Sequence, residues 1–191
     1  LRSLLGDNYV VMPDTCAHDS GYGGWHKDTT SLERDGFSFH KQEDYRLLTV
    51  AIYLQDNGSD GGGISVVPHS QFNDDKYVRP KKGILGKLSS EFLERFPKFG
   101  TVTVPSKAGD VVVFDTRLYH KASPARRKNN TSQRKLALFF TASRNNEHAR
   151  SFLDYLKTRP ADNKYFKDYK YSPPLVETCA SVGITLLSIG R

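Results

Sequence analysis

His26 and Asp28 are the residues whose types and spacing first indicate chemistry. They lie in the stretch 23–28, where two Gly, a Trp and the following Thr pair favour a strand that runs into a turn. Strand side chains two residues apart leave the same face, so an imidazole nitrogen and a carboxylate oxygen would converge. With a second His and open positions, they would form the facial site typical of mononuclear non-haem Fe(II) oxygenases.

His120 is the second His that the sequence favours. The His-x-Asp spacing alone is weak evidence for a metal site, because a random shuffle of this chain, with 6 His in 191 residues, contains about 0.5 such pairs on average. A second His is therefore required. His120 follows a turn and the apolar stretch 111–114, so it lies at the end of a predicted buried strand and can point inward. The remaining histidines are better interpreted as exposed or structurally bonded: His18, His40, His69 and His148.

Arg134 begins the last strongly apolar stretch, beside Leu136 and Leu138. An unpaired cation buried there would be costly. The residues alone leave two interpretations open: a guanidinium at a strand edge in water, or a planar fork that binds a carboxylate through two hydrogen bonds.

Composition indicates a single basic domain. The formal charge is +7 and the pI is about 9.4, which fits either a basic surface or an anionic substrate or partner. No nucleic-acid-binding pattern accompanies the basic clusters, so we do not expect a nucleic-acid partner. We expect a small, anionic or carrier-bound molecule instead. The sequence does not indicate an oligomeric state.

Cys16 and Cys179 lie far apart and favour a reducing compartment, with a single bridge left open. The sequence has no apolar run long enough to span a membrane and no signal peptide at its first residues. A cytoplasmic location is therefore the expectation. Because the chain begins with Leu1 rather than Met, we also expect that part of the natural protein precedes it.

Short apolar stretches separated by turns predict seven or eight strands. Residues 45–55 form the longest one, and the Gly-rich turn 56–63 followed by the strand 64–68 predicts a hairpin. The other expected strands are 8–13, 101–105, 111–115, 118–122 and 134–142. Without alternating helices, this pattern predicts a mainly β fold with flanking helices, arranged as a double-sheet jelly roll or cupin-like barrel.

Few helices are expected. Capping and stop signals predict one over 88–97, and a shared apolar face predicts another over 145–157. Residues 14–24 should be turn-rich, 31–44 should be an irregular loop and the best lid candidate, and 175–189 a closing strand or helix. We expect one domain over 1–191, with a core at about 8–142 and a helical and irregular extension over 143–191.

In this order the elements resemble the phytanoyl-CoA dioxygenase family of Fe(II)/2-oxoglutarate-dependent oxygenases. The resemblance spans roughly 20–142 and rests on His26-Lys27-Asp28, the apolar strand 47–56 with its Gly-rich turn, the segment 64–71, and the run from Gly109 to His120. One departure is that His69-Ser70-Gln71 stands where the family usually has Gly-Ser-His.

The resemblance implies a double-stranded β-helix in which His26, Asp28 and His120 hold Fe(II). Arg134 would bind the far carboxylate of 2-oxoglutarate, with Thr49 as a further hydroxyl contact. O2 would be the oxidant and ascorbate a supporting reductant. The implied reaction hydroxylates an unactivated C–H bond of a small metabolite and releases succinate and CO2. Desaturation or ring closure stays open, whereas Asp28 argues against halogenation because related halogenases have a small residue there.

Trp25, Lys27 and Arg117 border the triad and are predicted to line the substrate mouth, with Tyr119 a weaker candidate because it alternates with His120. Three alternatives remain open. The chain could be a non-catalytic cupin-like protein that binds a metal or ligand, the triad could hold Zn(II), or the oxygenase could be a nucleic-acid demethylase.

Overall fold

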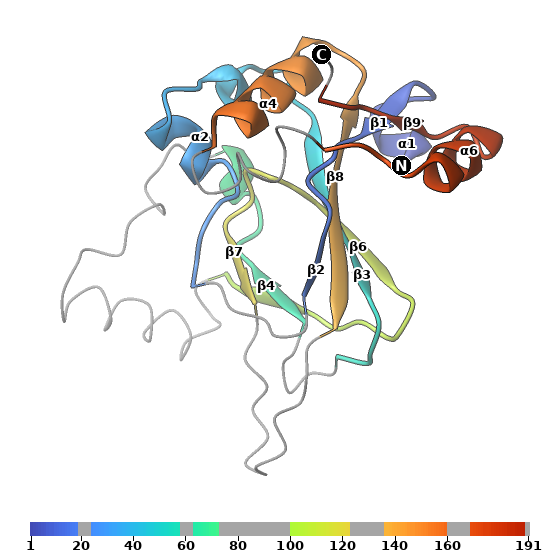
Figure 1. Cartoon of the computed structure of the whole chain (residues 1–191). Helices are drawn as coiled ribbons and strands as arrows, with labels where there is room; N and C mark the ends of the chain where they lie inside the picture. The colour runs from blue at the N-terminus through green and yellow to red at the C-terminus, as the bar shows by residue number, and fades with distance from the viewer. Residues whose placement is uncertain (19–23, 58–62, 73–99, 123–135, 160–168, 190–191) are drawn as a thin grey trace.

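The computed structural model describes residues 1–18, 24–57, 63–72, 100–122, 136–159 and 169–189. Within them the strands form two sheets (Figure 1). The larger has the order β6-β3-β8-β1-β9, with β2 also paired to β8, and the smaller has the order β5-β4-β7. The strands are β1 Tyr9–Val11, β2 Cys16–His18, β3 Leu47–Tyr53, β4 Ile64–Val66, β5 Val102–Val104, β6 Val111–Asp115, β7 His120–Ala122, β8 Ala137–Arg144 and β9 Thr185–Leu186.

Strand β3 is an interior strand of the larger sheet, which explains its nearly continuous apolar sequence. It pairs antiparallel with β6 on one edge and with β8 on the other. Its residues Leu47, Val50, Ala51 and Tyr53 are all buried. Thr49 lies opposite Thr141 of β8 in this register, so their side chains leave the same face of the sheet.

The predicted hairpin over 45–68 is wrong. Strands β3 and β4 do form, but they belong to different sheets, and β4 pairs with β5 and β7 instead. The chain leaves β3 towards the second sheet at Asn57, which forms an isolated bridge with Ser106 and donates a side-chain hydrogen bond to its hydroxyl at 3.0 Å. In a sequence, a Gly-rich turn between two apolar strands is compatible both with a hairpin and with a crossing from one sheet to the other.

The helices gather at one end of the sheets, where α2 and α4 lie together (Figure 1). Their bounds are α1 Arg2–Leu5, α2 Thr30–Arg34, α4 Glu147–Thr158 and α6 Pro173–Ser181, with short 3-10 turns at Phe39–Lys41 (η1) and Ser70–Phe72 (η2). Helix α4 confirms the helix expected over 145–157. The tail forms both a helix, α6, and a strand, β9. The helix expected over 88–97 lies outside the described residues.

The expectation of an irregular loop over 31–44 is wrong. This segment contains most of α2 and all of η1, and its Leu32 and Phe39 are buried in one core with Phe152 and Leu156 of α4. It is therefore packed against the body of the protein rather than free to act as a lid. Residues 14–24 also differ from expectation, because they include the short strand β2.

The structure also decides two points that the sequence left open. Cys16 and Cys179 are both free thiols, so no disulfide joins them. His69 adopts a positive φ of 65°, the left-handed conformation that favours glycine. The backbone here thus keeps a glycine-type conformation although His69 occupies the position where the resembled family usually has Gly.

Candidate metal centre

His26 and His120 are brought together by the backbone. They form an isolated antiparallel bridge in which each backbone N–H donates to the other residue's carbonyl at 2.9 Å. Residues paired in this way project their side chains from the same face. The two ring centroids accordingly lie 4.4 Å apart. His120 is the first residue of β7, and His26 lies in the segment that pairs with it.

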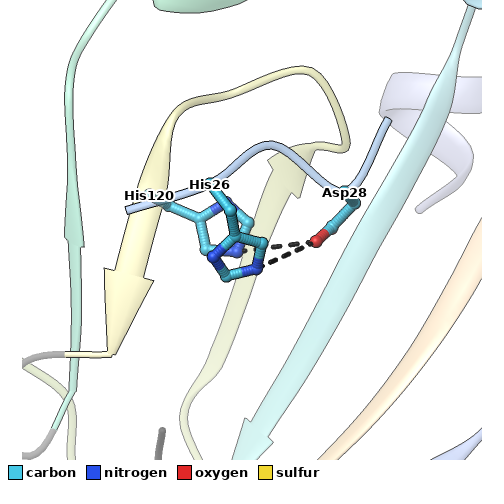
Figure 2. Close-up of side chains that lie close together, drawn as sticks. All are labelled: His26, Asp28 and His120. Carbon is cyan, nitrogen blue, oxygen red and sulfur yellow. Dashed lines mark ion pairs between the residues drawn. The ribbon is translucent and has the colours of Figure 1, made fainter. Parts of the chain in front are cut away.

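Asp28 completes a three-residue cluster (Figure 2). Its Oδ1 lies 3.6 Å from Nε2 of His26 and 3.6 Å from Nε2 of His120. The three potential ligand atoms all lie within 4.8 Å of one another. In the part of the chain that the structure describes, this is the one such group of His, Cys, Asp or Glu. The His side chains differ in exposure, at 44% for His26 and 10% for His120.

Both imidazoles are oriented through their other nitrogen. Nδ1 of His26 donates to the carbonyl of Gly24 at 2.7 Å, and Nδ1 of His120 donates to the carbonyl of Leu118 at 2.9 Å. Because a carbonyl can only accept, these bonds place a proton on Nδ1 of each ring and leave Nε2 directed at the cluster. This backbone support is the arrangement that metal-binding His residues commonly have.

Asp28 is oriented in the same manner. The Thr49 hydroxyl donates to its Oδ2 at 2.7 Å, which leaves Oδ1 facing the imidazoles. Burial raises the pKa of the Asp28 carboxyl, but His120 and the hydrogen bonds from His26 and Thr49 outweigh burial and lower the pKa below its usual value. Asp28 also raises the pKa of His26, against the effect of burial. The carboxylate is therefore ionised at neutral pH, as a metal ligand must be.

The cluster opens onto a cavity of about 710 Å³. Its wall includes the three residues above, inward side chains of both sheets, and residues of α2 and α4. Its polar and charged lining residues include Asp14, Lys27, Arg34, Thr49, Thr141, Tyr155 and Arg159. Two imidazoles and one carboxylate at the wall of a cavity supply three of the ligands of a facial metal site and leave its other positions open to small molecules.

The other predicted site residues have different positions. Lys27 is buried and lines the cavity, and Thr49 contacts Asp28. Trp25 is not among the lining residues; it stacks on Tyr119 at 5.3 Å, with Lys121 5.2 Å from its ring. It thus belongs to an aromatic and cationic cluster with Tyr119 and Lys121.

Arg117, the other residue predicted at the substrate mouth, is held by contacts with its neighbours. Its side chain pairs with Asp115 at 2.7 Å and lies over the ring of Tyr45 at 4.9 Å, and it does not line the cavity. It stabilises the turn before His120 instead. Arg134, the predicted 2-oxoglutarate ligand, lies outside the described residues.

Sequence reasoning missed several residues of the cavity wall. Asp14 and Thr141 are bonded to each other across 127 positions, and no local pattern links them. Arg34 was missed because the segment that contains α2 was expected to be a loop, and Tyr155 of α4 and Arg159, the residue that ends this helix, were not considered as site residues. The amphipathic face of α4 indicated a core, which its Phe152 and Leu156 do form.

Comparison with known families decides the relationship. The family model described as phytanoyl-CoA dioxygenase matches residues 5–135. The chain belongs to the phytanoyl-CoA dioxygenase family. The resemblance noted from the sequence is thereby confirmed. No match to a curated protein was found. None of the described helices is long and apolar enough to cross a membrane.

Solved structures give more distant similarities. EctD from S. alaskensis, solved with 2-oxoglutarate and 5-hydroxyectoine, is 22% identical; the match covers 75% of this chain and 47% of EctD, with a TM-score of 0.49. The apo form of the non-heme monooxygenase ThoJ is 18% identical, with 75% and 49% covered and a TM-score of 0.48. EvdMO1 is 19% identical, with 76% and 30% covered and a TM-score of 0.47. This family member thus spans half or less of the length of these proteins.

Proposed function

We propose that the protein is an Fe(II)- and 2-oxoglutarate-dependent oxygenase that hydroxylates an unactivated C–H bond of a small metabolite. One oxygen atom of O2 enters the substrate and the other enters 2-oxoglutarate, which leaves as succinate and CO2. The observation that carries the proposal is the convergence of His26, Asp28 and His120, each held by a hydrogen bond from its non-ligating side. Family membership supports the same chemistry.

The donor set fits Fe(II). Two imidazole nitrogens and one carboxylate oxygen are the protein ligands of the facial non-haem iron site. Bound iron would supply the redox chemistry with O2 and 2-oxoglutarate, whereas the protein binds, orients and excludes water. His26, Asp28 and His120 would hold the metal, and Thr49 would keep the Asp28 carboxylate in position through its hydrogen bond at 2.7 Å.

The co-substrate is assigned to the same cavity. Arg134 is proposed to pair with the far carboxylate of 2-oxoglutarate, as the family resemblance implies. Thr49 was a candidate for a co-substrate contact too, but its hydroxyl proton is already donated to Asp28. We therefore assign Thr49 to the positioning of Asp28. Lys27, which lines the cavity, remains a proposed substrate contact.

We further infer a double-stranded β-helix and a single domain. The inference is supported by the way successive strands change sheets: β3 lies in the larger sheet, β4 and β5 in the smaller, β6 in the larger, β7 in the smaller and β8 in the larger. Such alternation wraps the chain around a common interior, which is where His120 and Thr49 contribute to one cavity.

The proposal is tested by succinate formation from 2-oxoglutarate under air with Fe(II) and ascorbate. The wild-type protein should form succinate with Fe(II) but not with Zn(II), even without its substrate. Asp28→Ala should abolish this turnover because it removes a ligand. Asp7→Ala is the matched control, since Asp7 is exposed and does not line the cavity. Unchanged iron-dependent turnover in Asp28→Ala would overturn the assignment. Metal binding without turnover would favour a non-catalytic binding protein.

A further inference from the structure

Asp14 is a carboxylate in the cavity wall that the proposed chemistry does not use. It follows β1 and lines the same cavity as the metal cluster. The Thr141 hydroxyl donates to its Oδ2 at 2.7 Å. Its Oδ1 is buried and has no hydrogen-bond partner in the described part of the chain. A buried carboxylate oxygen without a donor is costly, and such exceptions in a binding cavity require an explanation.

Asp14 is placed next to the metal cluster by the sheet. Thr141, which holds Asp14, lies directly opposite Thr49, which holds Asp28. Side chains of such a pair lie about 5 Å apart at Cβ. The two carboxylates therefore occupy neighbouring places along one wall. The negative charge of Asp28 acts on Asp14 in the same sense as burial, and both oppose ionisation of Asp14.

No described cation of the cavity wall, the buried Lys27 included, donates a hydrogen bond to Oδ1 of Asp14. Arg34 lines the cavity, but its guanidinium pairs with Asp35 at 2.9 Å. Arg159 also lines the cavity, and its guanidinium lies over the ring of Tyr155 at 5.6 Å. Oδ1 of Asp14 accepts a hydrogen bond from neither guanidinium. The donor to Oδ1 is therefore sought outside the protein, in a molecule that enters the cavity.

The charge of the loaded site selects among donors. Among charged groups, Asp28 is the one that acts on Asp14, and its charge is negative. A bound metal ion would offset the charge of Asp28, so an ionised Asp14 leaves a negative charge at the wall whose buried Oδ1 has no donor in the described part of the chain. A protonated amine supplies both a hydrogen-bond donor and the compensating charge, whereas a hydroxyl supplies only the donor.

We propose that Asp14 is a specificity-determining residue that binds a protonated nitrogen of the substrate through Oδ1. The inference rests on the proposed function and names one chemical feature of its substrate, a primary or secondary amine that is cationic at neutral pH. Thr141 positions Asp14 by holding Oδ2. The basic residues of the cavity wall leave room for an anionic group elsewhere on the same molecule.

The test compares two probes that differ only in this group, cyclohexylamine and cyclohexanol. Binding of each is measured by calorimetry to protein loaded anaerobically with Fe(II) and 2-oxoglutarate. We expect the amine to bind more tightly than the alcohol. Asp14→Asn keeps the shape of the side chain and removes its charge, and should weaken amine binding about tenfold or more while leaving alcohol binding unchanged. Asp7→Asn, on the exposed surface, should change neither.

The visible charge-transfer absorption of the Fe(II)–2-oxoglutarate complex separates this inference from the proposed function. If no absorption forms in the wild-type protein, the proposed function fails first. If it forms but Asp14→Asn changes the affinity for 2-oxoglutarate, Asp14 belongs to the co-substrate site and the inference is overturned. Equal losses for both probes also overturn it. Asp14→Ser is measured in parallel, so that a folding defect in one variant does not decide the result.

Discussion

Asp28 and Asp14 show how the same local arrangement leads to opposite electrostatic outcomes. Each is a half-buried carboxylate whose Oδ2 accepts a hydrogen bond of 2.7 Å from a threonine, and the two threonines face each other across β3 and β8. Burial acts to raise the pKa of both carboxyls. At Asp14 burial outweighs the opposing hydrogen bonds and raises the pKa to about 6. At Asp28 the neighbouring imidazoles and Thr49 outweigh burial, and the pKa lies below its usual value.

The difference lies in the second oxygen. Oδ1 of Asp28 faces two imidazoles, which stabilise the ionised form, whereas Oδ1 of Asp14 has no partner among the described residues. Oδ1 of Asp28 thus has its partners within the protein, whereas Oδ1 of Asp14 has none among the described residues. We infer that the Asp28 side of the cavity is prepared for an ion and the Asp14 side for a group carried by a ligand.

The largest expected effect comes from removing a ligand of the metal cluster. His120→Gln should lower the affinity for Fe(II) by at least about 100-fold, because the amide is a poor substitute for the Nε2 lone pair. His69→Gln is the matched control, since His69 is exposed and lies outside the cavity wall. Affinity is measured by anaerobic titration with Fe(II). A loss of similar size in the control would contradict the placement of His120.

Substitution of Thr49 and Thr141 tests whether Asp28 and Asp14 have separate roles. Thr49→Val removes the hydrogen bond to Asp28, and loss of such outer support typically costs 10–100-fold in metal affinity or activity, so a loss of about 30-fold is expected. Thr141→Val removes the equivalent bond at Asp14 and should change metal affinity about twofold at most. Equal losses in the two variants, in the same metal titration, would show that the two carboxylates do not have separate roles.

The pH dependence of stability should distinguish Asp14. Its carboxyl pKa rises from 3.8 to about 6 on folding, so the folded state holds the extra proton between these values. Stability due to this group is full below pH 3.8 and is lost as the pH rises through about 6. Asp14→Asn should therefore gain about 2 kcal/mol relative to wild type between pH 4 and pH 7.

Urea unfolding of the metal-free proteins at several pH values measures this difference. Subtracting the two curves removes the groups that both proteins share. A flat difference across this pH range would contradict the assignment of a protonated, buried Asp14, because only a group with a raised pKa makes the variant progressively more stable with increasing pH.

The sequence predicted the metal cluster better than the cavity around it. His26 and Asp28 are close in the chain, and strand alternation is enough to bring them together. His120 was identified because it ends a buried strand, and the backbone bridge to His26 accounts for its position. Asp14 could not be found in this way. Its partner Thr141 is 127 positions away, and only the pairing of strands brings the two together.

The errors in the fold have a common cause. The hairpin over 45–68 was wrong because an apolar strand indicates that both its edges are paired but does not indicate with which strands. The helices in the segment 31–44 are too short to show a period, so the sequence predicts a loop there. Strand β2 has three exposed residues and therefore no alternation to detect. In each case the deciding contacts are distant in sequence.

Arg117 provides the smallest expected effect on the metal centre. It was predicted at the substrate mouth, but its side chain is only 15% exposed and forms a paired hydrogen bond with Asp115. Arg117→Gln should therefore lower the free energy of unfolding by about 1–2 kcal/mol while changing Fe(II) affinity about twofold at most. Because the turn from Asp115 leads directly to His120, the same titration also measures how rigidly β7 holds its ligand. A loss as large as that of Thr49→Val would mean that this ion pair positions His120, and that support of the metal centre extends beyond the hydrogen bonds its ligands make.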